Sequence, residues 1–192
     1  MFWTACKVFF TFTVITGFLY PLLITGIATL TMPHHANGSL VEVDGQIRGS
    51  LLIAQPFKQD KYFWPRPSAI EYDPLHSGGS NLGPTSRVLK DRIHKEGERL
   101  SKVYQQPLDR IPVEFVYTSG SGLDPHISEE AAYFQLERVM KARSFNSEQS
   151  EKFKKEMHSL REGHQLGLGP HYFNVLKLNI FLDQYSTTAI KS

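Results

Sequence analysis

The residues with the most chemical potential lie in the segment 119–126, which combines serine hydroxyls with a carboxylate and an imidazole. Ser121, Asp124 and His126 are the residue types of a serine hydrolase triad, in which a base activates a hydroxyl nucleophile. A nucleophile elbow, however, needs the pattern G-x-S-x-G, which Ser119-Gly120-Ser121-Gly122 does not match. Triads are also defined in space rather than along the chain. We therefore predict no catalytic residue in this segment.

The sequence contains no clear motif for binding a metal ion or a phosphate group. The eight histidines are scattered, with no H-E-x-x-H motif and no cysteine beside them, so no metal site is predicted. The run Ser77-Gly78-Gly79-Ser80-Asn81 lacks the lysine of a P-loop, although successive backbone amides there could form an anion nest. We predict no bound cofactor.

A long apolar stretch must position everything else. Residues 8–32 contain no charged side chain, and a helix of that length can cross a hydrocarbon core of about 30 Å. A cleaved secretory signal is one alternative, because Gly26-Ile27-Ala28 resembles a small-x-small cleavage site, and a buried core helix is another. The run is longer than the apolar part of a signal, at about 7–15 residues. We favour an uncleaved transmembrane helix.

The flanks of this stretch predict its orientation. Lys7 precedes it, whereas residues 32–47 contain no Lys or Arg and carry Glu42 and Asp44. By the positive-inside rule, residues 1–7 are cytoplasmic, residues 8–32 span the membrane and residues 33–192 form an extracytoplasmic (periplasmic) domain. The only cysteine, Cys6, precedes the span, so the outer domain is held by packing without disulfides. Its balanced charge provides no footprint for nucleic acid.

The outer part is long enough for one domain with its own core, and its patterns predict an α+β fold. A hairpin is expected around Asp44-Gly45, and Ser128 is a good N-cap. In chain order we predict the hairpin over 40–49, a buried strand or core segment over 50–54, a helix over 85–104, a strand over 112–117, helices over 129–143 and 147–161, and a strand entering a helix over 173–182.

An aromatic loop separates the hairpin from the first helix of the domain. Phe57, Tyr62, Phe63 and Trp64 lie among several prolines. Such aromatics can stack on a sugar or a peptide, or can fill the core beneath a rigid loop, and we favour the core role because large aromatics dominate burial in small domains.

Motifs along nearly the whole chain resemble those of one family. They are Tyr20-Pro21-Leu22-Leu23, Ala36-Asn37-Gly38-Ser39-Leu40, Arg48-Gly49-Ser50, Ile53-Ala54-Gln55-Pro56-Phe57, Tyr62-Phe63, Arg66-Pro67-Ser68-Ala69, Ser77-Gly78-Gly79-Ser80-Asn81-Leu82, the run 119–128, Gln135, Arg138-Val139, Ala142-Arg143, Asn174-Val175-Leu176 and Leu182-Asp183. In these motifs the chain resembles the C subunit of the Kdp-type, ATP-driven potassium-transporting complex.

The resemblance implies an accessory subunit of the bacterial inner membrane with no turnover of its own. Its implied partners are a channel-like potassium-binding subunit, a P-type ATPase subunit and a small membrane subunit, which together handle ATP and potassium. It also implies a catalytic chaperone that raises the ATP affinity of the ATPase subunit. Ser80 stands where an ATP-cassette-like signature carries Gln, which argues against nucleotide contact by that loop. An independent membrane-anchored enzyme or binding protein is the alternative.

Small residues and glycine-rich loops are the predicted partner interface, because they allow close approach of a neighbouring chain. For the loops, simple tight turns are an equal alternative. For the glycines of the span, the equal alternative is that glycine is common in membrane helices. No role is assigned to residues 144–169. The candidate interface residues are Gly17, Pro21 and Gly26 in the span, and Ser77, Gly78, Gly79, Ser80, Asn81, Ser119, Gly120, Ser121, Gly122 and Asp124 in the loops.

Overall fold

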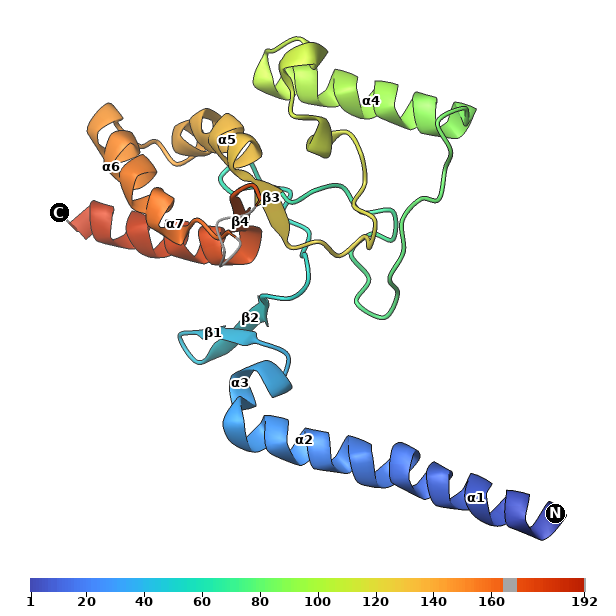
Figure 1. Cartoon of the computed structure of the whole chain (residues 1–192). Coiled ribbons are helices and arrows are strands. Elements are labelled where there is room, and N and C mark those ends of the chain that lie inside the picture. Colours follow the sequence, from blue (N-terminus) through green and yellow to red (C-terminus); the bar gives the residue numbers. More distant parts are fainter. Residues whose placement is uncertain (164–168, 192) are drawn as a thin grey trace. The chain divides into compact units, whose positions relative to one another are not determined.

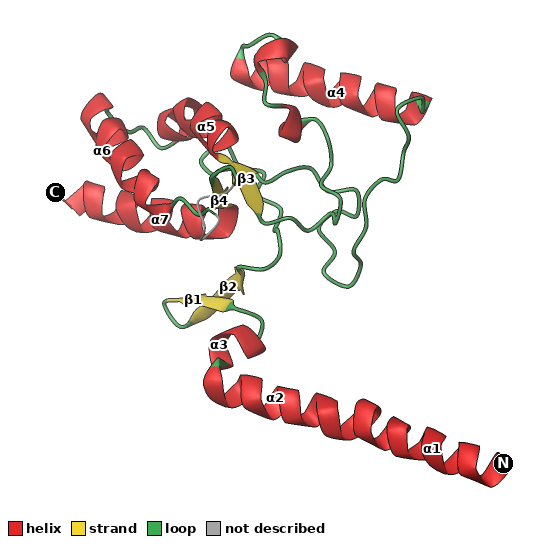
Figure 2. Ribbon diagram, viewed as in Figure 1, coloured by secondary structure: helices red, strands yellow, loops and turns green. Residues whose placement is uncertain are grey.

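A computed structural model describes residues 1–163 and 169–191 of the chain (Figure 1). The chain divides into two compact units, Met1–Ser50 and Leu51–Ser192. The segment 144–169, to which the sequence assigned no role, therefore lies partly outside the described residues. One apolar N-terminal helix is followed by a region of mixed helix and sheet (Figure 2), which confirms the predicted α+β class.

The first unit begins with a continuous helix made of α1 (Phe2–Val14), a π-helical turn (Ile15–Leu19) and α2 (Tyr20–Thr31). Its length and composition suffice to cross a membrane, and none of its side chains is buried within the chain. It starts before Lys7, earlier than the apolar run itself. The prediction of a membrane-spanning helix thus has a matching element.

The π-helical turn has an identifiable cause. The N–H of Tyr20 donates to the carbonyl of Ile15, five residues earlier. Pro21 follows directly, and because proline has no N–H it cannot donate to the carbonyl of Gly17, as a regular α-helix would require. A wider turn at such a position lets the helix continue past the missing hydrogen bond.

The rest of the first unit is a short helix and a hairpin. Helix α3 (Pro33–Ala36) leads to strands β1 (Leu40–Val43) and β2 (Gln46–Ser50), which pair antiparallel with Val43 opposite Gln46. Asp44 and Gly45 both have positive φ, 53° and 73°, as a type I′ turn demands. The hairpin predicted from Asp44-Gly45 is confirmed.

Two strand–helix pairs form the centre of the second unit. Strand β3 (His126–Ser128) runs directly into α5 (Glu129–Ala142), and β4 (Tyr172–Asn174) runs directly into α7 (Val175–Lys191). The two strands pair antiparallel. Each junction is capped by the last strand residue: Ser128 Oγ accepts from the N–H of Ala131 at 3.0 Å, and Asn174 Oδ1 accepts from the N–H of Lys177 at 3.1 Å. The predicted cap at Ser128 and the strand entering a helix near 173 are confirmed.

Helix α6 (Ser147–Met157) follows α5 in the chain and contributes to the core. It starts at a capping box formed by Asn146 and Gln149. Phe153 and Met157 are fully buried, as predicted from their spacing, and the last turn of the predicted helix is a 3-10 turn (His158–Leu160). The largest fully buried side chains of the domain are Phe63, Phe153, Phe173, Leu100, Ile127, Met157, Leu178, Leu182, Gln135, Val139 and Asn179.

Helix α4 (Arg87–Tyr104) confirms the helix predicted over 85–104, with Ser86 as its N-cap. Gly97 lies in its interior, where glycine costs about 1 kcal/mol relative to alanine. A Cβ at this position would come within 2.7 Å of Leu108 Cδ1, in the 3-10 turn Leu108–Arg110. The glycine is therefore explained by close packing of the segment that follows the helix.

The strand predicted over 112–117 is wrong. Residues 112–117 contain a 3-10 turn (Val113–Phe115), closed by a hydrogen bond from the N–H of Phe115 to the carbonyl of Pro112 at 3.0 Å. The successive residues Phe115 and Val116 are buried, whereas Val113 is 67% exposed, which contradicts the predicted alternation. Past Ser50, the segment to Ala54 is turns and bends rather than a strand.

Candidate functional site

The two glycine-rich segments predicted as interface lie against each other. The N–H of Gly78 donates to the carbonyl of Ser121 at 2.8 Å, and Ser77 Oγ donates to the same carbonyl at 3.3 Å. A Cβ on Gly79 would lie 3.0 Å from the carbonyl oxygen of Gly120. We call residues 77–81 and 119–124 the paired glycine loops.

Gly122 is required by this pairing. Its φ is +70°, and a Cβ there would lie 2.5 Å from Ile70 Cγ1 and 2.8 Å from the carbonyl oxygen of Gly78. A left-handed conformation costs a non-glycine residue about 1–2 kcal/mol before any contact is counted. By contrast, a Cβ on Gly78 or Gly120 would meet no atom within 4 Å. The paired glycine loops thus combine a closely packed inner side with bare backbone on the outside.

The second loop is fixed at both of its ends. Ser119 is buried, and its N–H donates to the carbonyl of Pro67 at 3.0 Å. Asp124 accepts from Arg66 Nη1 at 2.9 Å and from the N–H of His126 at 3.0 Å. Burial alone would raise the pKa of the Asp124 carboxyl, but hydrogen bonds from His126 and the charge of Arg66 outweigh it and lower the pKa. The loop is held as a rigid surface.

No triad is assembled from the residues that suggested one. Ser121 Oγ accepts from the N–H of Leu123 at 3.1 Å, and the Asp124 carboxylate is bonded to Arg66. Over residues 1–163 and 169–191, no group of three His, Cys, Asp or Glu side chains is placed to hold a metal ion. Ser80 is half-buried, and Asn81 is exposed with a φ of 52°.

The candidates in the membrane helix belong to the other unit. A Cβ on Gly17 or Gly26 would meet no atom of this chain within 4 Å, and Pro21 opens α2. Both glycines therefore leave room on the surface of the helix.

The aromatic loop is held by two buried amide side chains that sequence reasoning missed. Asn179 of α7 accepts from the N–H of Phe63 at 2.8 Å and donates to its carbonyl at 2.9 Å. Gln135 of α5 does the same for Trp64, at 2.7 Å and 3.1 Å. Phe63 is fully buried and Trp64 nearly so, which confirms the core role predicted for these two, whereas Phe57 and Tyr62 are half-buried. The one clue in the sequence was Asn179 itself, a polar residue among the apolar residues of α7, which could have indicated a buried hydrogen-bonding role.

Arg138 of α5 completes the support of this loop. Its guanidinium carbon lies 3.8 Å from the Trp64 ring centroid, and it donates to Tyr104 Oη at 3.0 Å and to the Tyr62 carbonyl at 3.1 Å. Burial lowers the pKa of Arg138. The loop backbone is thus fixed by side chains rather than by a neighbouring strand.

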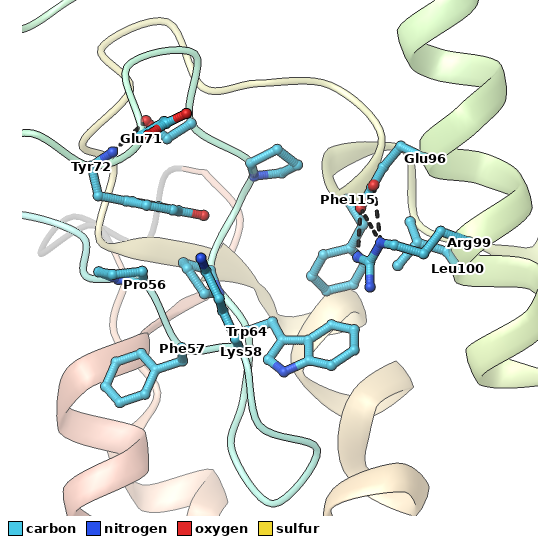
Figure 3. A pocket seen from close by; sticks show the side chains of 13 residues that line it. Pro56, Phe57, Lys58, Trp64, Glu71, Tyr72, Glu96, Arg99, Leu100 and Phe115 are labelled. Carbon is cyan, nitrogen blue, oxygen red and sulfur yellow. Dashed lines mark hydrogen bonds and ion pairs between the residues drawn. The ribbon is translucent and has the colours of Figure 1, made fainter.

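Beside the loop lies a cleft of about 590 Å³, which we call the aromatic cleft. In Figure 3, Phe57 and Tyr72 lie on one side and Glu96 and Arg99 of α4 lie on the other. Tyr72 Oη donates to the carbonyl of Arg66 at 2.9 Å, and burial raises the pKa of its hydroxyl to about 12.

The fold and these surfaces define a class: a protein with an N-terminal helix able to span a membrane, and an α+β domain whose distinctive surface is the backbone of two paired loops. The family model described as K+-transporting ATPase, c chain, matches residues 2–184. The chain therefore belongs to the family of K+-transporting ATPase c chains, which confirms the resemblance seen in its motifs.

Curated relatives from several bacteria agree with this family. A protein of Rhodopseudomonas palustris (strain TIE-1) is 46% identical over 185 residues, covering 89% of this chain and 90% of the relative. One from Bradyrhizobium diazoefficiens is 46% identical over 187 residues, with 90% of both chains covered. One from Photorhabdus laumondii is 45% identical over 174 residues, with 89% of both covered. Each is named Potassium-transporting ATPase KdpC subunit.

Proposed function

We propose that this chain is an accessory subunit, without turnover of its own, of an ATP-driven potassium uptake complex in the bacterial inner membrane. Its partners in this proposal are a channel-like potassium-binding subunit, a P-type ATPase subunit and a small membrane subunit. Membership in the family of K+-transporting ATPase c chains supports the proposal, as does the helix Phe2–Thr31. Lys7 before the apolar run, and the absence of Lys and Arg from residues 32–47, support a cytoplasmic N-terminus.

The paired glycine loops are the observation that carries the docking role. Bare backbone at Gly78 and Gly120 lets another chain approach closely, and the anchoring of Ser119 and Asp124 removes the entropic cost of ordering a loop. In our proposal this surface docks on the outer face of the potassium-binding subunit, where it stabilises assembly or shapes ion entry.

The decisive test adds bulk to the outside of the loops without disturbing the inside. Gly120→Arg places a long side chain where a Cβ meets no atom of this chain, so the domain should fold while docking is blocked. Thr85→Arg, on an exposed residue of the same unit, is the matched control. Affinity purification of the complex should lose the partner subunits with Gly120→Arg and retain them with Thr85→Arg. Normal assembly with Gly120→Arg would refute docking by these loops.

The membrane helix is proposed as a second contact. Because Gly17 and Gly26 have open space around them in this chain, Gly17→Leu and Gly26→Leu should leave the helix intact and weaken only its packing on another helix. Leu23→Phe, which also enlarges an exposed side chain of the span, is the control. Unchanged assembly with both glycine variants would exclude this contact.

A role in ATP affinity is proposed only through assembly. The N–H of Gly78 is already bonded to the carbonyl of Ser121, so this amide is not available to a phosphate. Lys102→Cys in a Cys6→Ser background, labelled in intact cells by a membrane-impermeant maleimide, tests the location of the domain. Labelling from outside is expected. If the cysteine is labelled only after the cells are opened, the domain lies in the cytoplasm. Direct contact between this domain and the nucleotide would then again be a possible mechanism.

A further inference from the structure

The aromatic cleft is a formed site whose walls have an unusual composition. Besides its aromatic side chains, it is lined by Pro56, Pro65 and Pro67, and proline has no backbone N–H to donate. Its volume of about 590 Å³ falls within the ~300–1,000 Å³ typical of ligand sites. The cleft can therefore hold a short stretch of ligand, against walls that are apolar and offer few backbone donors.

The carboxylates of Glu71 and Glu96 line the cleft together with two side-chain donors. Arg99 binds the Glu96 carboxylate through Nε, at 3.0–3.1 Å, and through Nη2, which occupies that acceptor and leaves Nη1 of Arg99 unused in the contact. Lys58 also lines the cleft. A ligand that presents carbonyl oxygens therefore finds side-chain donors in Arg99 and Lys58.

The ring of Trp64 is not open to a cationic ligand. The guanidinium carbon of Arg138 lies 3.8 Å from the ring centroid and that of Arg99 lies 5.1 Å from it. The indole is therefore already engaged by two cations, and a third positive charge would meet repulsion.

The rim of the cleft is pre-organised. Ser68 Oγ accepts from the N–H groups of Ile70, at 3.2 Å, and Tyr72, at 3.0 Å. Glu71 and Tyr72 are both held at positive φ, 56° and 62°, a conformation that surrounding contacts must enforce for residues other than glycine. With its hydroxyl bonded to the Arg66 carbonyl, Tyr72 is fixed at both ends. Rigid aromatic walls lower the entropic cost of binding.

We propose that the aromatic cleft binds an extended, proline-containing peptide segment of another protein in the polyproline II conformation. Such a segment presents prolyl rings to aromatic walls, exposes its carbonyl oxygens as acceptors and makes no internal hydrogen bonds. It matches three features of the cleft: the donors Arg99 and Lys58, the aromatic and prolyl side chains of the walls, and the fixed ring of Tyr72. The site is separate from the paired glycine loops, and binding does not depend on the proposed function.

The experiment uses the full-length protein in detergent with Trp3→Phe, which leaves Trp64 as its only tryptophan. A ten-residue polyproline peptide is titrated while Trp64 fluorescence is followed. A Gly/Ser decapeptide and the neutral oligosaccharide maltohexaose are titrated in parallel. A saturable response to polyproline alone is expected. An equal response to the Gly/Ser peptide, a response to the oligosaccharide alone, or no response at all would overturn the proposal.

Variants locate the binding. Tyr72→Ala removes one aromatic wall and should weaken polyproline binding by about tenfold. Phe57→Ala, on a partly exposed residue of the same wall, provides the same test if Tyr72→Ala does not fold, as judged by its unfolding transition. Lys90→Ala, on α4 outside the cleft, should bind as the parent does. Binding that is insensitive to both aromatic substitutions would also overturn the proposal.

Discussion

Replacing Gly122 by alanine tests the pairing of the glycine loops most directly. The new methyl group would lie 2.5 Å from Ile70 Cγ1 and 2.8 Å from the carbonyl oxygen of Gly78. Ile70 can rotate, but the carbonyl belongs to the backbone of the opposite loop, so the loops must separate. We expect about 1–2 kcal/mol for the left-handed backbone and about 1–3 kcal/mol for the overpacking.

These contributions amount to about 2–5 kcal/mol of the unfolding free energy. For a protein of this size, 1 kcal/mol shifts the melting temperature by about 2–4 °C, so Gly122→Ala should lower it by about 4–20 °C. Thermal unfolding is followed by Trp64 fluorescence in the Trp3→Phe background, because Trp64 lies in the core of the same unit.

Gly120→Ala provides the matched control. It lies in the same loop, but its Cβ would meet no atom within 4 Å and its φ is not positive, so its effect should stay within about 0.5 kcal/mol. Equal melting temperatures for Gly122→Ala and Gly120→Ala would show that the two loops are not packed against each other at Gly122.

Three further outcomes follow from other contacts. Asn179→Leu leaves the buried N–H and carbonyl of Phe63 without hydrogen-bond partners. It should lower the unfolding free energy measured in urea by about 2–6 kcal/mol. A loss below about 1 kcal/mol would exclude the role assigned to the Asn179 amide. The lowered pKa of Asp124 adds stability that is present above pH about 4 and lost as the pH falls through the folded-state pKa. Asp124→Asn should therefore reduce the drop in melting temperature between pH 6 and pH 3, and an unchanged drop would contradict it. The effect of Gly97→Ala on the unfolding free energy should be more favourable by at least about 1 kcal/mol in a Leu108→Ala background than in the parent protein. The reason is that Leu108→Ala removes the methyl group that would lie 2.7 Å from the new Cβ. Additive effects of the two substitutions would argue against this contact.

Local chemistry predicted the parts of the fold that depend on neighbouring residues. Asp44-Gly45 sets its own turn, and Ser128 caps its own helix, so both could be read from a few adjacent positions. The strand predicted over 112–117 is wrong because its alternation had no partner strand: β3 pairs with β4, and the segment closes on itself from Phe115 to Pro112.

The sequence indicated which loops form the candidate site but not how they are arranged, because the arrangement depends on contacts between residues distant in sequence. Glycine-rich composition marked both loops, and their bare backbone follows from composition alone. Their pairing depends on a hydrogen bond between Gly78 and Ser121, which are distant in sequence. The clamps of Gln135 and Asn179 on the aromatic loop are equally non-local, and no spacing rule identifies them.

The π-helical turn over residues 15–19 changes the rotational phase of the membrane helix. A single such turn accommodates one residue more than an α-helix would in the same rise, so the two halves are offset by about 100° from the faces a regular helix would present. Regular helical spacing therefore predicts the wrong partner across the turn. A residue of α1 lies on the same face as the α2 residue one position later in the sequence than that spacing would predict. A neighbouring helix that packs along the whole span therefore contacts residues in one helical register before the π-helical turn. After the turn it contacts residues in a register shifted by one position.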